Sequence, residues 1–470
     1  MRSLLFTMLI LATSLPAGAE IERRVANNGN LIMEDVPEIP ADIVTALNRY
    51  QNVRQAMFRT WDADGESLFI STRFGDVEQI HRLDSPGGAR HQVTYYREPV
   101  GEVSRQPGSS RLVFTRDAGG SEFAQVFLLD PEGGDAAMLS DGESRNSAVK
   151  FDREGRRLAY QSTRRNGAAN DIWIMDPEKP DSAELVLESP DGSWWGPVEF
   201  SESGSRMLVL NYISITDSRV NLLDLDTGEL TLLAGGASTP SFNQPLGFDD
   251  ANDGFWFITD QAGEFNALAW QSLEPGAEPE FVTADIPWNV DGGAISDDRR
   301  RAVFTVNEGG RTAVYLLDPK SRKYRRVDSI PVGLVFGVQF SPDGRKLAMT
   351  INTASSPSDT YVLELGKKAL DYGELTRWTY SEVGGLDTTA FREPELIEFP
   401  SFDTVAGEPR KIPAWLYKPA GPGPHPVVIS IHGGPEGQAR PVFSSTYQLW
   451  LAKLGVAVLV PNVRGSAGYG

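Results

Sequence analysis

The 470-residue sequence predicts a mainly β fold in which a β-propeller of about seven blades precedes an incomplete α/β domain. A short unit recurs about every 45 residues through the middle of the chain, and such a period is typical of repeat architectures. After Trp378 the repeat ends, and two continuous apolar runs flank a segment with helical spacing. The expected organisation is a leader over 1–19, a connecting segment over 20–55, the propeller over 56–380 and the α/β domain over 381–470.

The composition is that of a globular, acidic protein. Hydrophobic residues make up 40% and charged residues 23%, which excludes a disordered chain. Lys and Arg number 44 and Asp and Glu number 64, giving a net charge of −20. Because such a surface repels phosphate backbones and anionic lipid, we expect neither a nucleic-acid nor a membrane partner. The absence of Cys excludes disulfides, thiolate metal sites and a Cys nucleophile, and no cofactor or metal motif occurs.

Residues 1–19 have the features of a secretory signal. A positive start, Met1-Arg2-Ser3, precedes the apolar run Leu4–Leu15, and small residues follow, with cleavage expected after Ala19. The alternative is a membrane anchor, but an apolar run of about twelve residues is too short to span a bilayer. We therefore expect export to the periplasm or secretion.

The segment 20–55 precedes the repeats. It predicts an extended lead through Pro37–Pro40 and a short helix within Ala41–Val53. The apolar residues of this helix fall on one face, and they are Ile43, Val44, Leu47 and Tyr50. We expect this segment to pack beside the propeller or against the last domain.

Each repeat begins with an apolar residue and a polar turn, which most copies close with glycine. We interpret the Asp and Gly residues as turn formers and not as ligands, because both residue types are favoured in turns for backbone reasons. The first and sixth copies match least well, so six or eight blades remain open. The turns are Trp61–Gly65, Gln106–Gly108, Phe151–Gly155, Phe200–Gly204, Phe248–Gly254, Ile295–Arg299 and Phe340–Gly344.

Two strand patterns follow each turn. In the last copy Leu347, Met349 and Ile351 alternate with smaller residues, the period of a half-buried strand. A second apolar strand closing on Asp follows in most copies, as in Val126–Asp130, Ile172–Asp176, Leu222–Asp226 and Val314–Asp318. Each unit therefore predicts a meander of about four strands, and such meanders bury both faces only when they are arranged radially. We assign the tryptophans Trp194, Trp195 and Trp256 to packing.

The segment after Trp378 predicts a different architecture. Leu396–Phe399 and Ile412–Tyr417 are typical of two antiparallel strands. Val427–Ile431 is an apolar run typical of a strand covered on both faces. Helical spacing from Phe443 to Leu454 ends at Gly455, and Val456–Val460 forms a second buried strand, so the sequence predicts a parallel βαβ unit.

These motifs resemble a known family. The repeat Phe340–Leu347 (Phe-Ser-Pro-Asp-Gly-Arg-Lys-Leu) is similar to the propeller repeats of TolB-like proteins and of prolyl oligopeptidase relatives. The apolar strand, His432-Gly-Gly-Pro435, the helix and Asn462–Gly470 resemble the opening of the α/β-hydrolase domain of prolyl oligopeptidase family serine peptidases. The acylaminoacyl-peptidase and dipeptidyl-aminopeptidase-like branch fits best, and Leu375–Trp378 also resembles it. The Glu-Glu pair with which dipeptidyl-peptidase relatives hold a substrate amino terminus does not occur.

The resemblance implies acyl-transfer chemistry with an oligopeptide substrate and no cofactor. Negative charge develops on the substrate carbonyl oxygen, and N–H donors stabilise it. By resemblance, the Gly434 N–H supplies one oxyanion donor, and His432 and Gly433 support its loop. Some relatives have a Tyr donor where this chain has His432, so the backbone version is implied here. We expect no catalytic role for the other histidines, which are His81, His91 and His425.

The catalytic triad of the resembled family is not found in these residues. No Gly-x-Ser-x-Gly pattern occurs, and the stretch around Ser466 lacks the first glycine and follows the wrong strand. We therefore expect the Ser, Asp and His of the triad beyond Gly470, and we interpret the sequence as truncated inside its catalytic domain. Val427–Ile431 would then present an open apolar edge. We expect this chain alone to be inactive on peptides and esters. We also expect residues 381–470 to be poorly ordered or prone to aggregation.

The leading hypothesis is a serine peptidase whose propeller gates access for short peptides. A non-catalytic periplasmic propeller that binds other proteins is an alternative, although the helix and strands after His425 weigh against it. An esterase on the same fold is a third possibility. The residue preference at the cleaved bond, the endo- or exopeptidase mode and the oligomeric state stay open.

Overall fold

The computed structural model describes residues 21–434 and 436–469, so the expected signal peptide lies outside the described residues. The fold is mainly β, with 46% strand and 6% helix. The chain divides into two compact units, the first ending at Asn48 and the second beginning at Arg49. No helix in the described part of the chain is both long and apolar enough to cross a membrane.

The first unit contains a hairpin and most of one helix. Strands β1 (Arg23–Ala26) and β2 (Leu31–Glu34) pair antiparallel around the short helix η1 (Asn27–Gly29), a hairpin that we did not predict. Helix α1 (Ala41–Tyr50) ends before the predicted limit at Val53. Val53 instead belongs to strand β3 (Val53–Arg54), which pairs with β32 (Glu382–Val383) in the second unit.

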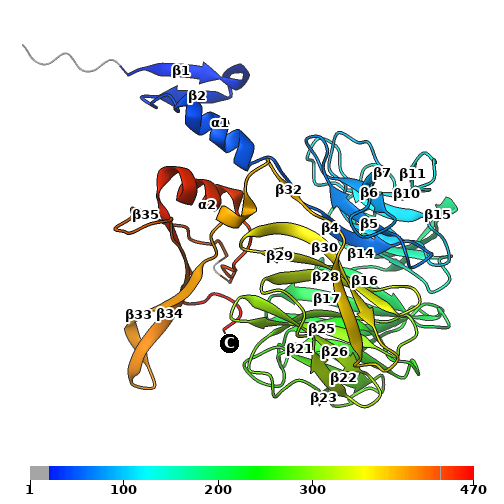
Figure 1. Cartoon of the computed structure of the whole chain (residues 1–470). Coiled ribbons are helices and arrows are strands. Elements are labelled where there is room, and N and C mark those ends of the chain that lie inside the picture. Colours follow the sequence, from blue (N-terminus) through cyan, green and yellow to red (C-terminus); the bar gives the residue numbers. More distant parts are fainter. Residues whose placement is uncertain (1–20, 435, 470) are drawn as a thin grey trace, which may run out of the picture. The chain divides into compact units, whose positions relative to one another are not determined.

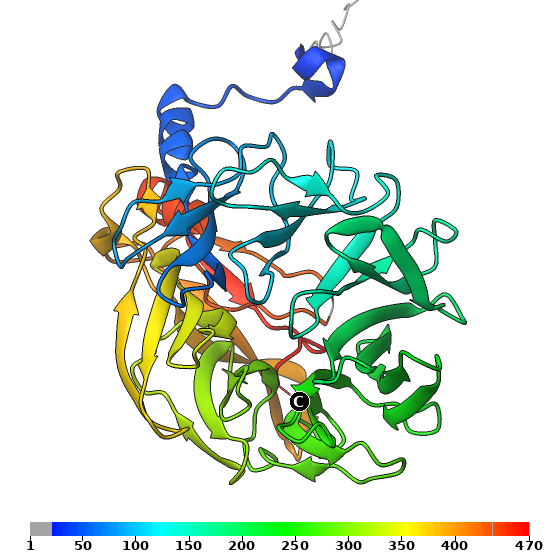
Figure 2. The same ribbon diagram turned by 90° about the vertical axis from the view of Figure 1, so that its right-hand side faces the viewer.

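Seven four-stranded sheets follow one another along the chain, and each is a meander in which consecutive strands are neighbours. Figure 1 shows the sheets side by side, and Figure 2 shows them arranged in a ring around a central axis. These sheets are the blades of a propeller, numbered one to seven here in chain order. The described residues thus contain seven blades, and the predicted propeller of about seven blades is confirmed.

Blades one to four contain β4 (Met57–Trp61), β5 (Leu68–Thr72), β6 (Gln79–Leu83), β7 (His91–Gln92), β8 (Val103–Arg105), β9 (Leu112–Arg116), β10 (Gln125–Leu129), β11 (Ala137–Met138), β12 (Asn146–Phe151), β13 (Leu158–Ser162), β14 (Asp171–Asp176), β15 (Lys179–Leu187), β16 (Trp194–Phe200), β17 (Arg206–Ser214), β18 (Asp217–Asp224) and β19 (Leu230–Ala234). Blades five to seven contain β20 (Asn243–Phe248), β21 (Gly254–Thr259), β22 (Ala267–Ser272), β23 (Glu280–Phe281), β24 (Val290–Ile295), β25 (Ala302–Glu308), β26 (Arg311–Asp318), β27 (Lys323–Arg326), β28 (Leu334–Phe340), β29 (Lys346–Thr353), β30 (Ser356–Leu365) and β31 (Tyr372–Arg377).

The turn between the first and second strand of each blade contains a residue with positive φ. In five blades this residue is glycine, as at Gly65 (φ 67°) and Gly344 (φ 68°). In blade five it is Asn252 (φ 54°), and in blade six it is Arg299 (φ 58°). The left-handed conformation is thus kept where the glycine is lost, which explains why the sixth copy of the repeat matched poorly in the sequence.

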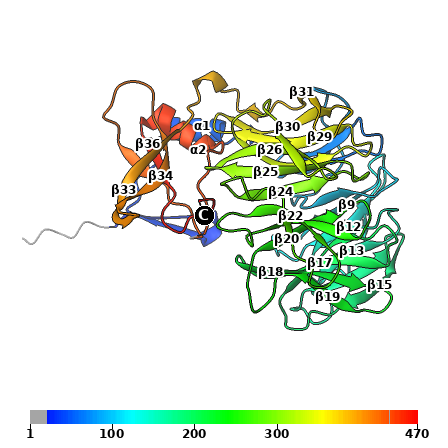
Figure 3. The same cartoon turned by 90° about the horizontal axis from the view of Figure 1, so that it is seen from below.

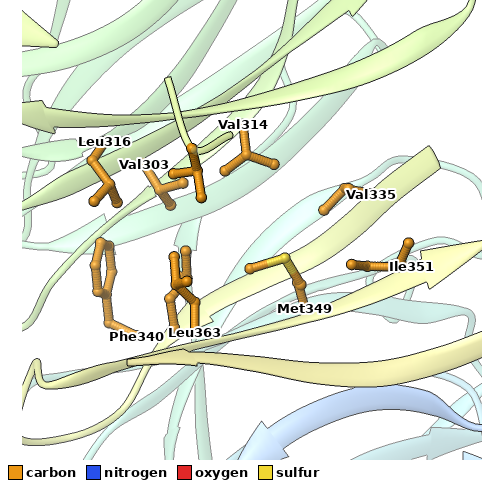
Figure 4. Packing of buried hydrophobic residues seen from close by; sticks show 10 residues of the cluster. Val303, Val314, Leu316, Val335, Phe340, Met349, Ile351 and Leu363 are labelled. Carbon is orange, nitrogen blue, oxygen red and sulfur yellow. The ribbon is translucent and has the colours of Figure 1, made fainter. Parts of the chain in front are cut away.

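The core consists of hydrophobic clusters between neighbouring blades. Figure 4 shows the cluster between blades six and seven, where Val303 and Val314 face Met349 and Leu363. All four side chains are buried, and each contributes about 1.5–3 kcal/mol relative to an exposed position. The sheets therefore stay together mainly through side-chain packing, because among the described residues only isolated backbone contacts, such as the bridge between Asn170 and Trp194, join one blade to the next.

The ring closes between blades one and seven by the same kind of packing. Phe58 and Trp61 of β4 are buried against Val362 of β30 and Trp378. The indole N–H of Trp61 donates to the carbonyl of Gln339 at 3.1 Å, across the junction of the two blades.

The residues after the propeller form a separate mixed sheet with strand order β33-β34-β36-β35. Figure 3 shows β33, β34 and β36 apart from the blades. A short helix η2 (Thr388–Ala390) precedes the antiparallel pair, and β35 and β36 run parallel to each other. The predicted strand–helix–strand unit is present, and the fold class is confirmed. The strands are β33 (Glu395–Val405), β34 (Glu408–Tyr417), β35 (Val427–Ile429) and β36 (Ala457–Pro461).

The connection between β35 and β36 is helix α2 (Ser445–Leu449), continued by one turn of π-helix, η3 (Trp450–Leu454). The helix begins two residues after Phe443, because the Ser444 side chain caps it by accepting from the Tyr447 N–H at 3.2 Å. It ends at Gly455 in the left-handed conformation, as predicted.

Strand β35 is exposed, which corrects the prediction of a strand covered on both faces. Val427 is 54% exposed and Ile429 is 59% exposed. The reason is its position, because β35 lies at the edge of the sheet and pairs among the described strands with β36 alone. The expected open apolar edge is therefore present in this structure.

Candidate functional site

The loop His432–Gly437 begins at the carboxyl end of β35, beside the parallel strand β36. The pairing of the two strands extends to Ser430, whose N–H donates to the Leu459 carbonyl at 2.9 Å. Functional groups of α/β sheets gather at the carboxyl ends of parallel strands. The loop with the three candidate residues therefore lies where such a fold places its chemistry.

Gly434 has a conformation that only glycine adopts easily. Its φ is 135°, and an added Cβ would lie 2.5 Å from the Glu436 nitrogen and 2.6 Å from the Gly437 nitrogen. The Gly434 N–H finds no acceptor among the described residues, so it remains available to a bound oxygen atom. By contrast, a Cβ on Gly433 would meet nothing within 4 Å. The oxyanion role of Gly434 stays a prediction.

The His432 ring is held between two oxygen atoms. Its Nδ1 lies 2.8 Å from the carbonyl oxygen of Gly433, and its Nε2 lies 2.8 Å from the hydroxyl oxygen of Ser466. The His432 side chain thus joins the loop to the segment that contains Ser466, and the supporting role given to it by resemblance stays a prediction. Ser466 had no role in the sequence analysis.

The segment Asn462–Tyr469 packs against the same loop. The Ala467 N–H donates to the carbonyls of Glu436 at 3.2 Å and Gly437 at 3.1 Å. Asn462 accepts from the Ala439 N–H at 2.7 Å and donates to the Ala439 carbonyl at 3.0 Å. The two motifs that carried the family resemblance are therefore bonded to each other.

The residues directly after the loop contact the propeller. Asn307, in β25, donates to the Gln438 side chain at 2.7 Å. Arg440 donates to the Gly310 carbonyl at 3.1 Å and to the Thr312 hydroxyl at 2.9 Å, and it pairs with Asp291 at 3.0 Å. Burial raises the pKa of Asp291, and the neighbouring Arg440 guanidinium acts against that rise.

A cavity of about 480 Å³ lies between the propeller and the last sheet. The propeller supplies Ile215, Phe242 and Asp260, and the last sheet and its loops supply Glu436 and Ser466 among other residues. Burial raises the pKa of Asp260, and the Phe242 N–H that donates to it acts in the opposite direction. The cavity is large enough for part of a peptide, and it borders the glycine loop.

The remaining histidines lie away from this loop. His81, in β6, is fully buried beside Phe74, with ring centroids 4.7 Å apart, and burial lowers its pKa. His91, in β7, is exposed, and His425 is half-buried before β35. No cluster of acidic or histidine side chains that could hold a metal occurs among residues 21–434 and 436–469.

Sequence reasoning missed the residues that fix the loop in place. Gln438, Arg440 and Asn307 act through contacts between segments far apart in the chain, which no local pattern reveals. Asn462 and Ser466 lie in the motif that we used only as a family marker. The polar residues within and directly after the two glycine motifs, His432–Pro435 and Asn462–Gly470, could have been treated as candidates, which would have included Asn462 and Ser466.

A propeller followed by a mixed sheet with a glycine loop after its parallel edge strand is the architecture of the prolyl oligopeptidases. Solved structures confirm this fold. One match comes from a structural and mechanistic study of two prolyl endopeptidases and their inter-domain dynamics. It has a TM-score of 0.75 and 14% identity, and it covers 91% of this chain and 64% of the matched chain. Prolyl oligopeptidase B from Galerina marginata, bound to a 35mer hydrolysis and macrocyclization substrate, matches with TM-score 0.74 and 12% identity, covering 95% and 71%. A puromycin-hydrolyzing peptidase of Mycobacterium tuberculosis matches with TM-score 0.70 and 14% identity, covering 90% and 68%.

A sequence comparison agrees with this fold. The chain is 24% identical over 431 residues to an uncharacterized peptidase, YuxL, of Bacillus subtilis strain 168. The match covers 87% of this chain, which spans about half the length of that relative (55%). No protein-family model matches the sequence. The resemblance to the prolyl oligopeptidase family that the sequence indicated is thus confirmed.

Proposed function

We propose that the protein is a serine-type peptidase that hydrolyses short peptides through an acyl-enzyme. The observation that carries the proposal is the Gly434 N–H, which has no acceptor among the described residues and lies on a loop at the carboxyl end of a parallel strand. The adjoining cavity of about 480 Å³ offers space for a peptide beside this loop. The fold shared with prolyl oligopeptidases supports the same class of reaction.

In this proposal, a serine oxygen attacks the peptide carbonyl, and the carbonyl oxygen becomes negative. The Gly434 N–H then donates to that oxygen, an interaction whose loss typically costs 10²–10³ in rate. The His432 ring keeps the loop in place through Gly433. No Gly-x-Ser-x-Gly pattern occurs within these 470 residues, so we propose that the natural gene product supplies the nucleophile, base and acid from residues that are not among them. The 470 residues alone are accordingly inactive on peptides and esters.

Gly434→Ala in the natural gene product tests the oxyanion role. The new methyl group would displace the nitrogens of Glu436 and Gly437, so kcat/KM on a chromogenic tripeptide should fall at least 100-fold. Gly407→Ala is the matched control, because Gly407 also has positive φ (86°) but lies in the β33–β34 turn with nothing within 4 Å of its added Cβ. Equal activity of the two variants, with equal melting temperatures, would remove Gly434 from the mechanism.

We also propose that the propeller gates access to the cavity. Strand β24 is the first strand of blade six, and Asp291 near its start pairs with Arg440 at 3.0 Å. Arg299 follows the other end of β24, and its Nη2 lies 2.6 Å from the Glu199 carboxylate of blade four. Glu199 also accepts from the Phe248 N–H of blade five at 2.7 Å. This link joins blades four, five and six. It lies at the opposite end of β24 from the contact between Asp291 and Arg440.

Further charged groups act on one another at the same end of β24 as Arg299. Burial raises the pKa of Asp297, in blade six, and the guanidinium groups of Arg105, Arg299 and Arg153 oppose that rise. Arg105 belongs to blade two and Arg153 to blade three, so these charges come from opposite sides of the ring. We propose that these charged side chains narrow the opening of the ring, so that substrate enters between the propeller and the last sheet.

Export is a further proposal, and it rests on residues 1–19. N-terminal sequencing of the protein recovered outside the cytoplasm should begin at Glu20. Recovery of the protein in the cytoplasm with Arg2 still present would contradict it.

A further inference from the structure

The motif Asn462–Tyr469 has no chemistry of its own in the proposed reaction, yet it contacts the glycine loop at several points. Ser466 is buried, and its N–H donates to the Val463 carbonyl at 3.0 Å within a tight turn. Gly465 and Gly468 have φ of 88° and 89°, which allows that turn. The turn therefore holds the Ser466 hydroxyl at a defined position.

The turn is itself fixed from the propeller side. A Cβ on Gly468 would lie 2.5 Å from the amide nitrogen of Gln438 and 2.8 Å from that of Asn307. The backbone therefore approaches both side chains closely. Asn462 is also buried, and it donates to the Tyr469 hydroxyl at 2.9 Å. The Ser466 hydroxyl thus belongs to a segment that is anchored through Asn462 and Gly468, which are both buried.

The hydrogen-bond partners of His432 indicate which of its ring nitrogens carries a proton. A carbonyl oxygen only accepts, so the Nδ1 that lies 2.8 Å from the Gly433 carbonyl carries the proton. In the tautomer with its proton on Nδ1 alone, the Nε2 accepts, and the Ser466 hydroxyl donates to it at 2.8 Å. The chain Ser466–His432–Gly433 is a directed series of hydrogen bonds that ends one residue before Gly434.

We propose that Ser466 is a positioning residue, which fixes the tautomer and orientation of His432 and through them the Gly433–Gly434 backbone. The proposal rests on the peptidase function proposed above. In that reaction, the oxyanion donor must be in place before the substrate carbonyl becomes charged. Ser466 borders the cavity, and in this proposal it acts through His432 and not on the reacting atoms.

Ring ¹⁵N NMR of the 470-residue chain tests the proposal directly. The chain has four histidines, so selective labelling yields four ring systems, and His432→Gln identifies one of them by its loss. We expect a protonated Nδ1 and an unprotonated Nε2 for His432. Ser466→Ala should mix the two tautomers, and Ser466→Thr, which keeps the hydroxyl, should restore the single tautomer.

Ser430→Ala is the matched control. Ser430 lies in the same sheet, and its hydroxyl is also 2.8 Å from a side-chain partner, the Tyr447 hydroxyl, but it does not contact His432. The His432 ring signals of this variant should match those of the unmodified chain. An unchanged His432 spectrum in Ser466→Ala, or the same change in Ser430→Ala, would overturn the proposal.

Kinetics of the natural gene product provide a second readout. Ser466→Ala should lower kcat about tenfold with KM unchanged, because the loss concerns the transition state and not substrate binding. Ser466→Thr should recover most of kcat. If the His432 spectrum changes as stated while the gene product hydrolyses no peptide, the positioning role stands and the proposed peptidase function falls.

Discussion

Each blade turns from its first strand to its second through one residue with positive φ. Glycine serves in five blades, and Asn252 and Arg299 serve in the other two. A left-handed conformation costs other residues roughly 1 kcal/mol, so the repeated glycine reflects backbone energetics and not ligand binding. Arg299 has a second role that accounts for a non-glycine residue there, since its guanidinium pairs with Glu199.

Gly344→Ala should lower the free energy of unfolding by about 1 kcal/mol. The nearest atoms to an added Cβ are the Asp298 carboxylate oxygens at 3.9 Å, so the cost is one of backbone strain alone. Gly75→Ala is the control, because its φ lies outside the left-handed range and nothing is within 4 Å of its Cβ. Urea unfolding followed by tryptophan fluorescence should show a lower midpoint for Gly344→Ala only.

Asp64 gives the first turn a pH-dependent stability. Its carboxylate accepts from the N–H groups of Glu66 and Ser67, both at 2.8 Å, and from the Ser67 hydroxyl. Burial acts to raise the pKa of Asp64, but these hydrogen bonds outweigh burial, and the pKa is lowered. Because the folded-state pKa is lower than the unfolded value of about 3.9, this stability is present above that value and is lost as the pH falls through the folded pKa.

Asp64→Asn should therefore be less stable by about 1 kcal/mol at pH 7. The difference from the unmodified protein should shrink as the pH falls below about 4, where Asp64 of the unfolded chain becomes protonated while the folded carboxylate still resists protonation. The urea unfolding midpoints of Asp64→Asn and of the unmodified protein, taken at pH 7 and at pH 3, measure this difference in stability. A difference that is equal at the two pH values would contradict the role given to the carboxylate.

At the scale of single residues, the sequence supported part of the site. Gly434 and His432 could be singled out because the glycine motif follows an apolar strand directly. Asn307 and Arg440 could not, because their contacts join segments more than a hundred residues apart. Ser466 was visible in the sequence, but its hydrogen bond to His432 depends on how two loops fold against each other.

At the scale of elements, β35 differs most from expectation. A run of apolar residues predicts a strand but not its neighbours, and here one side of the strand has no partner among the described strands. Val427, Ile429 and Ile431 are consequently more than half exposed. Such an edge offers unpaired backbone groups and apolar side chains to other molecules.

Ile429→Lys should reduce self-association of the 470-residue chain, because a charge on the edge strand disfavours pairing with a second edge. Sedimentation velocity across a concentration series should show a several-fold smaller oligomer fraction. Val332→Lys is the control, since Val332 is 69% exposed on a propeller loop and lies in no strand. Equal behaviour of the two variants would show that β35 is not the associating edge.

At the scale of the whole molecule, the charges at the far end of the ring make a prediction about substrate size. Arg299→Ala removes the link between blades four and six. In the natural gene product it should raise, several-fold, the kcat/KM of a peptide of about 30 residues relative to that of a tripeptide. Arg300→Ala is the matched control, because its side chain is 84% exposed. An unchanged ratio in Arg299→Ala would exclude this end of the ring as a gate.

The architecture was predictable where it depends on local, repeated physics. Alternating apolar residues and turn chemistry recur in each blade, so the ring and its blade number followed from the sequence. The hairpin β1–β2 and the pairing of β3 with β32 did not, because short strands such as Val53–Arg54 carry too few residues to show a period. The docking of the glycine loop on β25 and β26 is a long-range contact with no sequence signature.

The most direct measurement of the central claim is the mapping of a fluorophosphonate label on the natural gene product. The probe reacts with an activated serine, and mass spectrometry of the digested protein locates that serine. The account predicts labelling together with hydrolysis of short peptides, at a serine that is not among these 470 residues. Labelling at Ser466 or at another serine of this sequence, or peptide hydrolysis without any labelling, would contradict it.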